Sequence, residues 1–135
     1  MNDDLAYLIA RISGYRSYAD EDVDVRSATD MRVRAYLGEA LSAAQARLNG
    51  AIDTKTAEPL EAALLHCVFA DQEFTQMLRS PNLSEAAVTA LIRLDRTLVE
   101  LAESLTTIEP AALYDTARRI DATFEQRRVP TNVTA

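Results

Sequence analysis

Two aspartates stand among apolar residues that recur with helical spacing, and carboxylates in such positions could bind a cation or support catalysis. Asp71 falls in the apolar stripe of a helix predicted over 56–80, and Asp95 falls in the stripe of a helix predicted over 84–105. Arg16 lies on the apolar side of the first predicted helix, within reach of one of these carboxylates. Because charged side chains are rarely buried without a partner, these three residues are predicted to form a core polar network that fixes helix order and register.

The alternative is a ligand- or metal-binding bundle, in which Asp71 and Asp95, joined by Asp30 or Asp121, converge on a metal ion or a cationic ligand. Carboxylate-bridged metal bundles carry Glu-x-x-His repeats on two helices, and this sequence has none. The single histidine, His66, has no ligand-type residue at the neighbouring positions of its own helix. We therefore predict no metal and no cofactor, and a ligand-binding or enzymatic pocket around the two aspartates stays the competing hypothesis.

His66 raises a third possibility, because an exposed histidine on a helical bundle can carry a phosphoryl group. The residues that follow His66 lack the lysine and glycine that such phosphocarrier domains place after their histidine. Cys67 points about 100° away from His66 on the same helix, so the two side chains do not form a nucleophile and base pair. We expect no catalytic residue in the chain, and we expect Cys67 to be a small buried hydrophobe.

The charge of the chain argues against a nucleic-acid partner. Aspartates and glutamates number 21 against 14 lysines and arginines, which gives an acidic chain with a net charge of −7. The densest basic stretch holds Arg118, Arg119, Arg127 and Arg128, but acidic residues share the same predicted helix. We interpret this stretch as a solvated helix face with ion pairs between residues four positions apart.

The sequence predicts neither a membrane span nor a disulfide. The longest nearly apolar window, Ala62–Ala70, is about half of the twenty residues that a spanning helix needs. The chain starts with Asn2, Asp3 and Asp4 instead of a basic region and an apolar run, which predicts no signal peptide. A single cysteine excludes an internal disulfide. These features predict a cytoplasmic protein.

The positions of the apolar residues predict the fold class. Across most of the chain they recur at spacings of three and four, as in Leu91, Leu94 and Leu98, and no stretch alternates long enough to suggest a sheet. We predict an all-α fold, an up-and-down antiparallel helical bundle of four to five helices, as a single domain over 1–128 with a flexible C-terminal tail over 129–135. The first predicted helix covers 4–17. The second begins between residues 22 and 30 and ends at 48. The other three cover 56–80, 84–105 and 107–128.

Two of these helices carry more apolar surface than one neighbour can cover. The helix over 84–105 is apolar over about 180° of its circumference. The helix over 56–80 has apolar residues outside its main stripe, among them Leu65 and Phe69. Surplus apolar surface either places a helix at the centre of a monomer or forms a subunit interface. Our leading hypothesis is a homodimer that acts by protein–protein contact without catalytic chemistry of its own.

Overall fold

The computed structural model describes residues 2–81 and 83–128, and the predicted tail over 129–135 lies outside these described residues. The regular structure of the described chain is entirely helical, which confirms the predicted all-α bundle. No helix within the described ranges is long and apolar enough to cross a membrane. The helices are α1 (Asp3–Arg11), α2 (Val23–Arg47), α3 (Thr54–Val68), α4 (Gln72–Leu78), α5 (Glu85–Ser104) and α6 (Pro110–Arg128).

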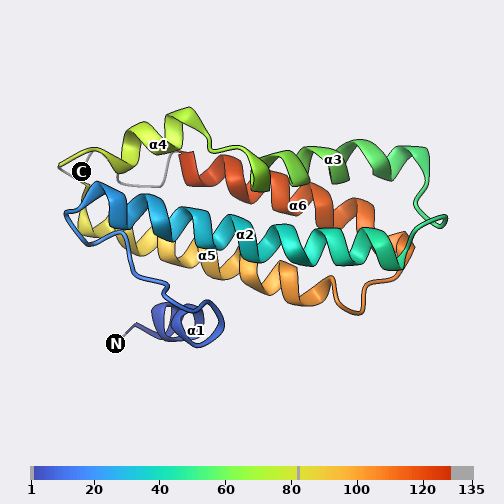
Figure 1. Cartoon of the computed structure of the whole chain (residues 1–135), viewed down its shortest axis with the longest axis horizontal. Helices are drawn as coiled ribbons and strands as arrows, with labels where there is room; N and C mark the ends of the chain where they lie inside the picture. Colours follow the sequence, from blue (N-terminus) through green and yellow to red (C-terminus); the bar gives the residue numbers. More distant parts are fainter. Residues whose placement is uncertain (1, 82, 129–135) are drawn as a thin grey trace.

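Four helical columns run side by side along the bundle, namely α2, α3 continued by α4, α5 and α6 (Figure 1). Consecutive columns run in opposite directions, as the up-and-down prediction requires. In the described part of the chain, α2 and α6 each pack against both α3 and α5, so α2 stands diagonally opposite α6. Two neighbouring pairs, α2 with α5 and α3 with α6, are therefore parallel. The parallel pairing of α3 and α6 places Lys55 beside Tyr114 and, further along, His66 beside Asp121.

The core lies between these columns, and α5 is its central member. Leu91 and Leu98 of α5 are completely buried, and each such side chain contributes about 2 kcal/mol through the hydrophobic effect. Because α5 packs against α1, α2 and α6, its wide apolar surface is covered within one chain. Of the two helices predicted to carry surplus apolar surface, only α3 retains large exposed apolar side chains.

The first helix is shorter than the predicted helix over 4–17. It ends at Arg11, and Gly14 follows with φ +80°, in the left-handed region that favours glycine. The turn carries the chain away from the helix axis and sends Tyr15 and Tyr18 into the core, where both are buried. The prediction is wrong here because the helical spacing of the apolar residues continues past a glycine that ends the helix.

We expect Gly14→Ala and Gly50→Ala to destabilise the protein by similar amounts. Both glycines have positive φ, 80° and 89°, so each alanine costs about 1–2 kcal/mol of backbone strain. At Gly14 the new Cβ would also lie 2.9 Å from Nε of Arg32, whereas nothing lies within 4 Å of it at Gly50. Arg32 is exposed, so its side chain can move away at little cost. Urea unfolding of the two variants measures both losses, and a much larger loss at Gly14 would contradict a freely movable Arg32 side chain.

The helix predicted over 56–80 is interrupted in the structure, which corrects the prediction that Asp71 lies within a helix. α3 ends at Val68, and α4 begins at Gln72. Asp71 is the N-cap of α4, since its carboxylate accepts a hydrogen bond from the backbone N–H of Phe74 at 2.9 Å. A continuous helix would carry this carboxylate into the apolar stripe, whereas the break lets it satisfy a free helix N–H.

Candidate functional site

A buried polar network surrounds Asp95 at the centre of the bundle. Asp95, on α5, is 0% exposed. Its Oδ2 accepts hydrogen bonds from the hydroxyls of Tyr15 at 2.8 Å and Tyr18 at 2.6 Å. Its Oδ1 lies 3.2 Å from Nε of Arg127 on α6. The segment after α1, the middle of α5 and the end of α6 therefore meet at one carboxylate.

Arg127 joins Asp95 to a second carboxylate, that of Asp30 on α2. Only 2% of the Arg127 side chain is exposed, and its Nη2 donates to Oδ1 of Asp30 at 2.7 Å and to the Tyr18 hydroxyl at 3.2 Å. Oδ2 of Asp30 accepts in turn from Nε of Arg34 at 3.0 Å. Two guanidinium groups thus balance two carboxylates, as buried charges require. We call Asp30, Arg34, Asp95 and Arg127 the buried ion network.

Burial and these partners shift the pKa values of the groups. Loss of water raises the pKa of Asp95, although Arg127 and the two tyrosine hydroxyls act in the opposite sense. Burial, followed by the nearby Asp95 carboxylate, raises the pKa of Tyr15 and of Tyr18 well above the usual range, so both stay hydroxyl donors. Burial lowers the pKa of Arg127, but the surrounding acidic groups outweigh burial and raise it.

The contact between Oδ1 of Asp95 and Nε of Arg127 differs in kind from the other links of the network. The two atoms are 3.2 Å apart, but both are buried without an aligned hydrogen bond. The attraction across this contact is therefore mainly that of opposite charges, which is strengthened where water is excluded. Among the residues that the structure describes, Arg127 supplies the only counter-charge within 4 Å of Asp95.

The structure brings only one of the three predicted network residues into this core. Asp95 is buried as predicted, but the side chain of Arg16 is 65% exposed and pairs with Asp20 on the surface. The prediction for Arg16 is wrong because α1 ends before it, so Arg16 lies on no apolar helix face. Arg127 occupies the buried position predicted for Arg16. The interpretation of Arg127 as a solvated residue is therefore also wrong.

A sequence signal for the burial of Arg127 exists in α6. The buried residues Leu113, Ala117, Ile120 and Phe124 are spaced by four, three and four positions, and one more step of three reaches Arg127. The aromatic surroundings agree with this position, because the ring centre of Phe124 lies 5.5 Å from Cζ of Arg127. The position of a charged residue relative to a buried apolar stripe therefore predicts its burial better than the charges of its neighbours in the sequence do.

Asp71 lies outside the buried ion network. Besides capping α4, its carboxylate forms an ion pair with Nε of Arg128 at the end of α6. Burial acts to raise the pKa of Asp71, but the backbone N–H of Phe74 and the Arg128 guanidinium outweigh burial and lower it. Asp71 is therefore a charged helix cap that links α4 to α6, and it is not brought together with Asp95.

His66 and Cys67 face different elements. Nε2 of His66 lies 2.7 Å from Oδ1 of Asp121, and its ring stacks on that of Phe124 with the centres 4.8 Å apart. Cys67 faces Gly38 of α2, and burial raises the pKa of its thiol to about 12. A thiol that stays protonated is a poor nucleophile. His66 and Cys67 contact different elements, so the two side chains do not form a nucleophile and base pair.

The aspartates considered as metal ligands all lie beside nitrogen donors of the protein itself. Among the described residues, no group of three or more His, Cys, Asp or Glu could hold a metal ion. The cavity next to Arg127 has a volume of about 10 Å³, which is room for one water molecule and not for a metabolite. The pairs are Asp30 and Asp95 with Arg127, Asp71 with Arg128, and Asp121 with His66.

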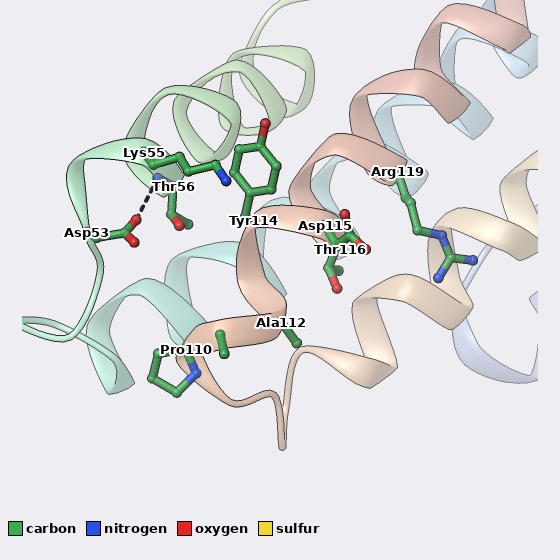
Figure 2. A pocket seen from close by; sticks show the side chains of 10 residues that line it. Asp53, Lys55, Thr56, Pro110, Ala112, Tyr114, Asp115, Thr116 and Arg119 are labelled. Carbon is green, nitrogen blue, oxygen red and sulfur yellow. Dashed lines mark hydrogen bonds between the residues drawn. The ribbon is translucent and has the colours of Figure 1, made fainter.

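A larger hollow opens where α3 and α6 begin side by side, and no motif in the sequence marks it (Figure 2). Its volume is about 460 Å³, within the usual range of ligand pockets. Lys55 extends over the ring of Tyr114, with Nζ 4.6 Å from the ring centre. Arg119 lines the opposite side, but Asp53 and Asp115 belong to the same lining, so neither sign of charge prevails.

Large apolar side chains are exposed at the C-terminal end of α3. Val68 and Phe69 are each 66% exposed, and Leu65 is 49% exposed. Their spacing of three and four positions places Val68 and Phe69 one turn beyond Leu65 along the helix. Because the rest of α3 packs against α2 and α6, this end is where its surplus apolar face remains uncovered.

Met31 of α2 borders the same end of α3. It is 60% exposed and stands one turn before Arg34. Nη1 of Arg34 donates to the carbonyl oxygen of Cys67 at 3.3 Å, which fixes this part of α2 against the end of α3. Three of the five large exposed apolar residues in the described chain therefore lie at this end of α3, and a fourth, Met31, lies one turn from the residue that holds α2 against it. We call them the apolar patch: Met31, Leu65, Val68 and Phe69.

The fold and these sites define the class of the molecule: an all-α helical bundle with a charge-balanced buried ion network and an exposed apolar patch. In comparisons with known proteins, no family model, no curated protein and no solved structure matches the chain. The basis for a functional proposal is therefore the geometry of the chain itself.

Proposed function

We propose that this protein acts by contact with other protein chains, and that its apolar patch pairs with a second copy to form a homodimer. The observation that carries the proposal is the exposure of the large apolar side chains of Val68 and Phe69 at the end of α3. Single exposed apolar residues are normal, but a cluster of large ones marks an interaction surface. An interface over the patch would remove this apolar surface from water.

A second copy is the partner that suits the composition of the patch and its rim. In a two-fold symmetric interface the same surface supplies both sides, so an uncharged patch can cover itself. A standard interface buries about 800 Å² on each partner, so the patch would be its apolar centre and nearby polar residues its rim. The rim holds both signs of charge, with Glu61 one turn before Leu65 and Arg128 beside Asp71 at the other end. The rim of each copy therefore presents both signs of charge to the other copy.

The buried ion network favours a structural role over the competing ligand-binding hypothesis. Its charges are matched within the chain, and the adjoining cavity of about 10 Å³ is too small for a metabolite. We therefore propose that the core has no catalytic chemistry and takes no cofactor. The one cysteine, Cys67, is a free thiol, which suits a reducing compartment such as the cytoplasm, the location that we propose.

Phe69→Ser is expected to weaken self-association by at least tenfold. Truncating a hot-spot side chain at the centre of an interface costs about 2 kcal/mol or more, and about 1.4 kcal/mol already corresponds to a factor of ten in Kd. Sedimentation velocity over a concentration series of the wild-type protein and the variant measures the two constants. Circular dichroism checks that the variant keeps its helix content.

Ile9→Ser is the matched control for this experiment. Ile9 is the fifth large exposed apolar residue, and it lies on α1 outside the patch. We expect its substitution to leave the dissociation constant unchanged. A wild-type protein that stays monomeric at every concentration would contradict the proposed homodimer, and so would equal weakening by the two substitutions.

A further inference from the structure

We infer that the two copies pack with their α3 helices antiparallel, across a two-fold axis that passes near Val68. This inference rests on the proposed homodimer and adds the direction and the register of the pairing. Its basis is the order in which charged and apolar residues follow one another along the exposed side of α3.

The exposed side of α3 carries two glutamates in its first half, after Lys55, and ends in the apolar patch. Glu58, Glu61, Leu65 and Val68 are all exposed, and their spacings of three, four and three place them along one side of the helix. The axis of a dimer centred on the apolar part therefore passes through the second half of α3. The distance from Glu58 and Glu61 of one copy to the same residues of the other copy then depends on whether the two helices run parallel or antiparallel.

A parallel pairing would bring like charges together. It would set Glu58 and Glu61 of one copy beside the same residues of its partner, and four carboxylates at one interface repel one another. The chain already carries a net charge of −7, so no general attraction between copies offsets this repulsion.

An antiparallel pairing separates these charges. With a rise of 1.5 Å per residue, two Glu61 residues related by an axis near Val68 lie about 20 Å apart along the helices. This separation is more than twice the screening length of about 8 Å at physiological ionic strength. The antiparallel direction also opposes the two helix dipoles.

Cysteine cross-linking distinguishes the two directions. The substitutions are made in a Cys67→Ser background, so that each chain carries one thiol. A disulfide needs Cβ atoms about 4 Å apart, which two residues on a two-fold axis can reach. We expect oxidised glutathione to link most of the Val68→Cys dimer. Two Glu58→Cys residues would lie about 30 Å apart along antiparallel helices, and we expect them to stay unlinked.

The possible outcomes separate this inference from the proposed function. Cross-linking of Glu58→Cys as readily as Val68→Cys would overturn the antiparallel direction in favour of a parallel one. If neither variant cross-links although native mass spectrometry shows a dimer, the pairing through α3 is overturned while the homodimer stands. If the unsubstituted chain is monomeric, the proposed function fails as well. Ile9→Cys, on α1, measures the cross-linking that arises from random collisions.

Discussion

Arg127→Met is expected to lower the free energy of unfolding by about 3–5 kcal/mol, the usual cost of removing one partner of a buried ion pair. Without Arg127, Asp30 keeps Arg34 as a counter-charge, but Asp95 keeps only the hydroxyls of two tyrosines. A carboxylate that is 0% exposed would then stand in the core without a cation. Small domains are commonly stable by only about 5–15 kcal/mol, so the variant would lose a large part of its stability.

Urea unfolding at an unchanged m value measures this loss. Arg128→Met is the matched control, because Arg128 is the next residue and its ion pair with Asp71 is partly exposed. Removing such a partly exposed pair is expected to cost far less stability than removing the buried one. The double variant with Asp95→Leu and Arg127→Met should recover part of the stability, because it leaves no unpaired charge at Asp95. The recovery is incomplete because the buried hydroxyls of Tyr15 and Tyr18 lose their acceptor. Equal losses for Arg127→Met and Arg128→Met would contradict the buried ion network.

Lowering the pH should reduce the difference in the free energy of unfolding between Arg127→Met and the wild-type protein. Burial raises the pKa of Asp95 in the folded chain, and the substitution removes the cation that opposes this shift. The folded variant therefore binds the Asp95 proton more tightly than the unfolded chain does. As the pH falls through this raised pKa, the carboxyl group becomes neutral and the folded state gains stability relative to its value at neutral pH. A difference in the free energy of unfolding that grows as the pH falls would contradict this account.

Arg26→Met is expected to cost about 3 kcal/mol of stability, because it removes a charged donor from several carbonyl oxygens, and hydrogen bonds to charged groups contribute about 1.5–3 kcal/mol each. Arg26 is buried on α2. Its Nη1 donates to the carbonyl oxygens of Leu78 at 2.8 Å and Ser80 at 2.9 Å, and its Nε donates to that of Asp20 at 2.6 Å. Arg26 thus holds the end of α4, where the chain leaves to cross the bundle.

Two measurements test the role of Arg26. Urea unfolding gives the loss of stability, and hydrogen exchange should show faster exchange at the end of α4 than in α5. Arg79→Met is the control, because Arg79 lies beside the same segment but is exposed. If the two substitutions change stability equally, Arg26 does not anchor this crossing.

The sequence by itself determined the fold class and most helix boundaries. Apolar residues at spacings of three and four specify helices, and the ends follow from capping residues within about four positions of each terminus. Ser84 caps α5 at the predicted start, where its hydroxyl accepts from the N–H of Ala87. Gly50 takes a positive φ just after the end of α2. Such interactions are local, so a single chain segment contains the information for them.

Only the tertiary structure decided which charged residues are buried and which apolar face stays open. Asp71 and Asp95 both fall in phase with apolar residues, yet one caps a helix and the other anchors the core. The difference arises because the partners of Asp95 come from distant segments, with Tyr15 lying 80 positions away in the sequence. Spacing gives the direction in which a residue points, but not which element stands opposite. For the same reason, α1 covers the wide face of α5 while the patch on α3 remains exposed.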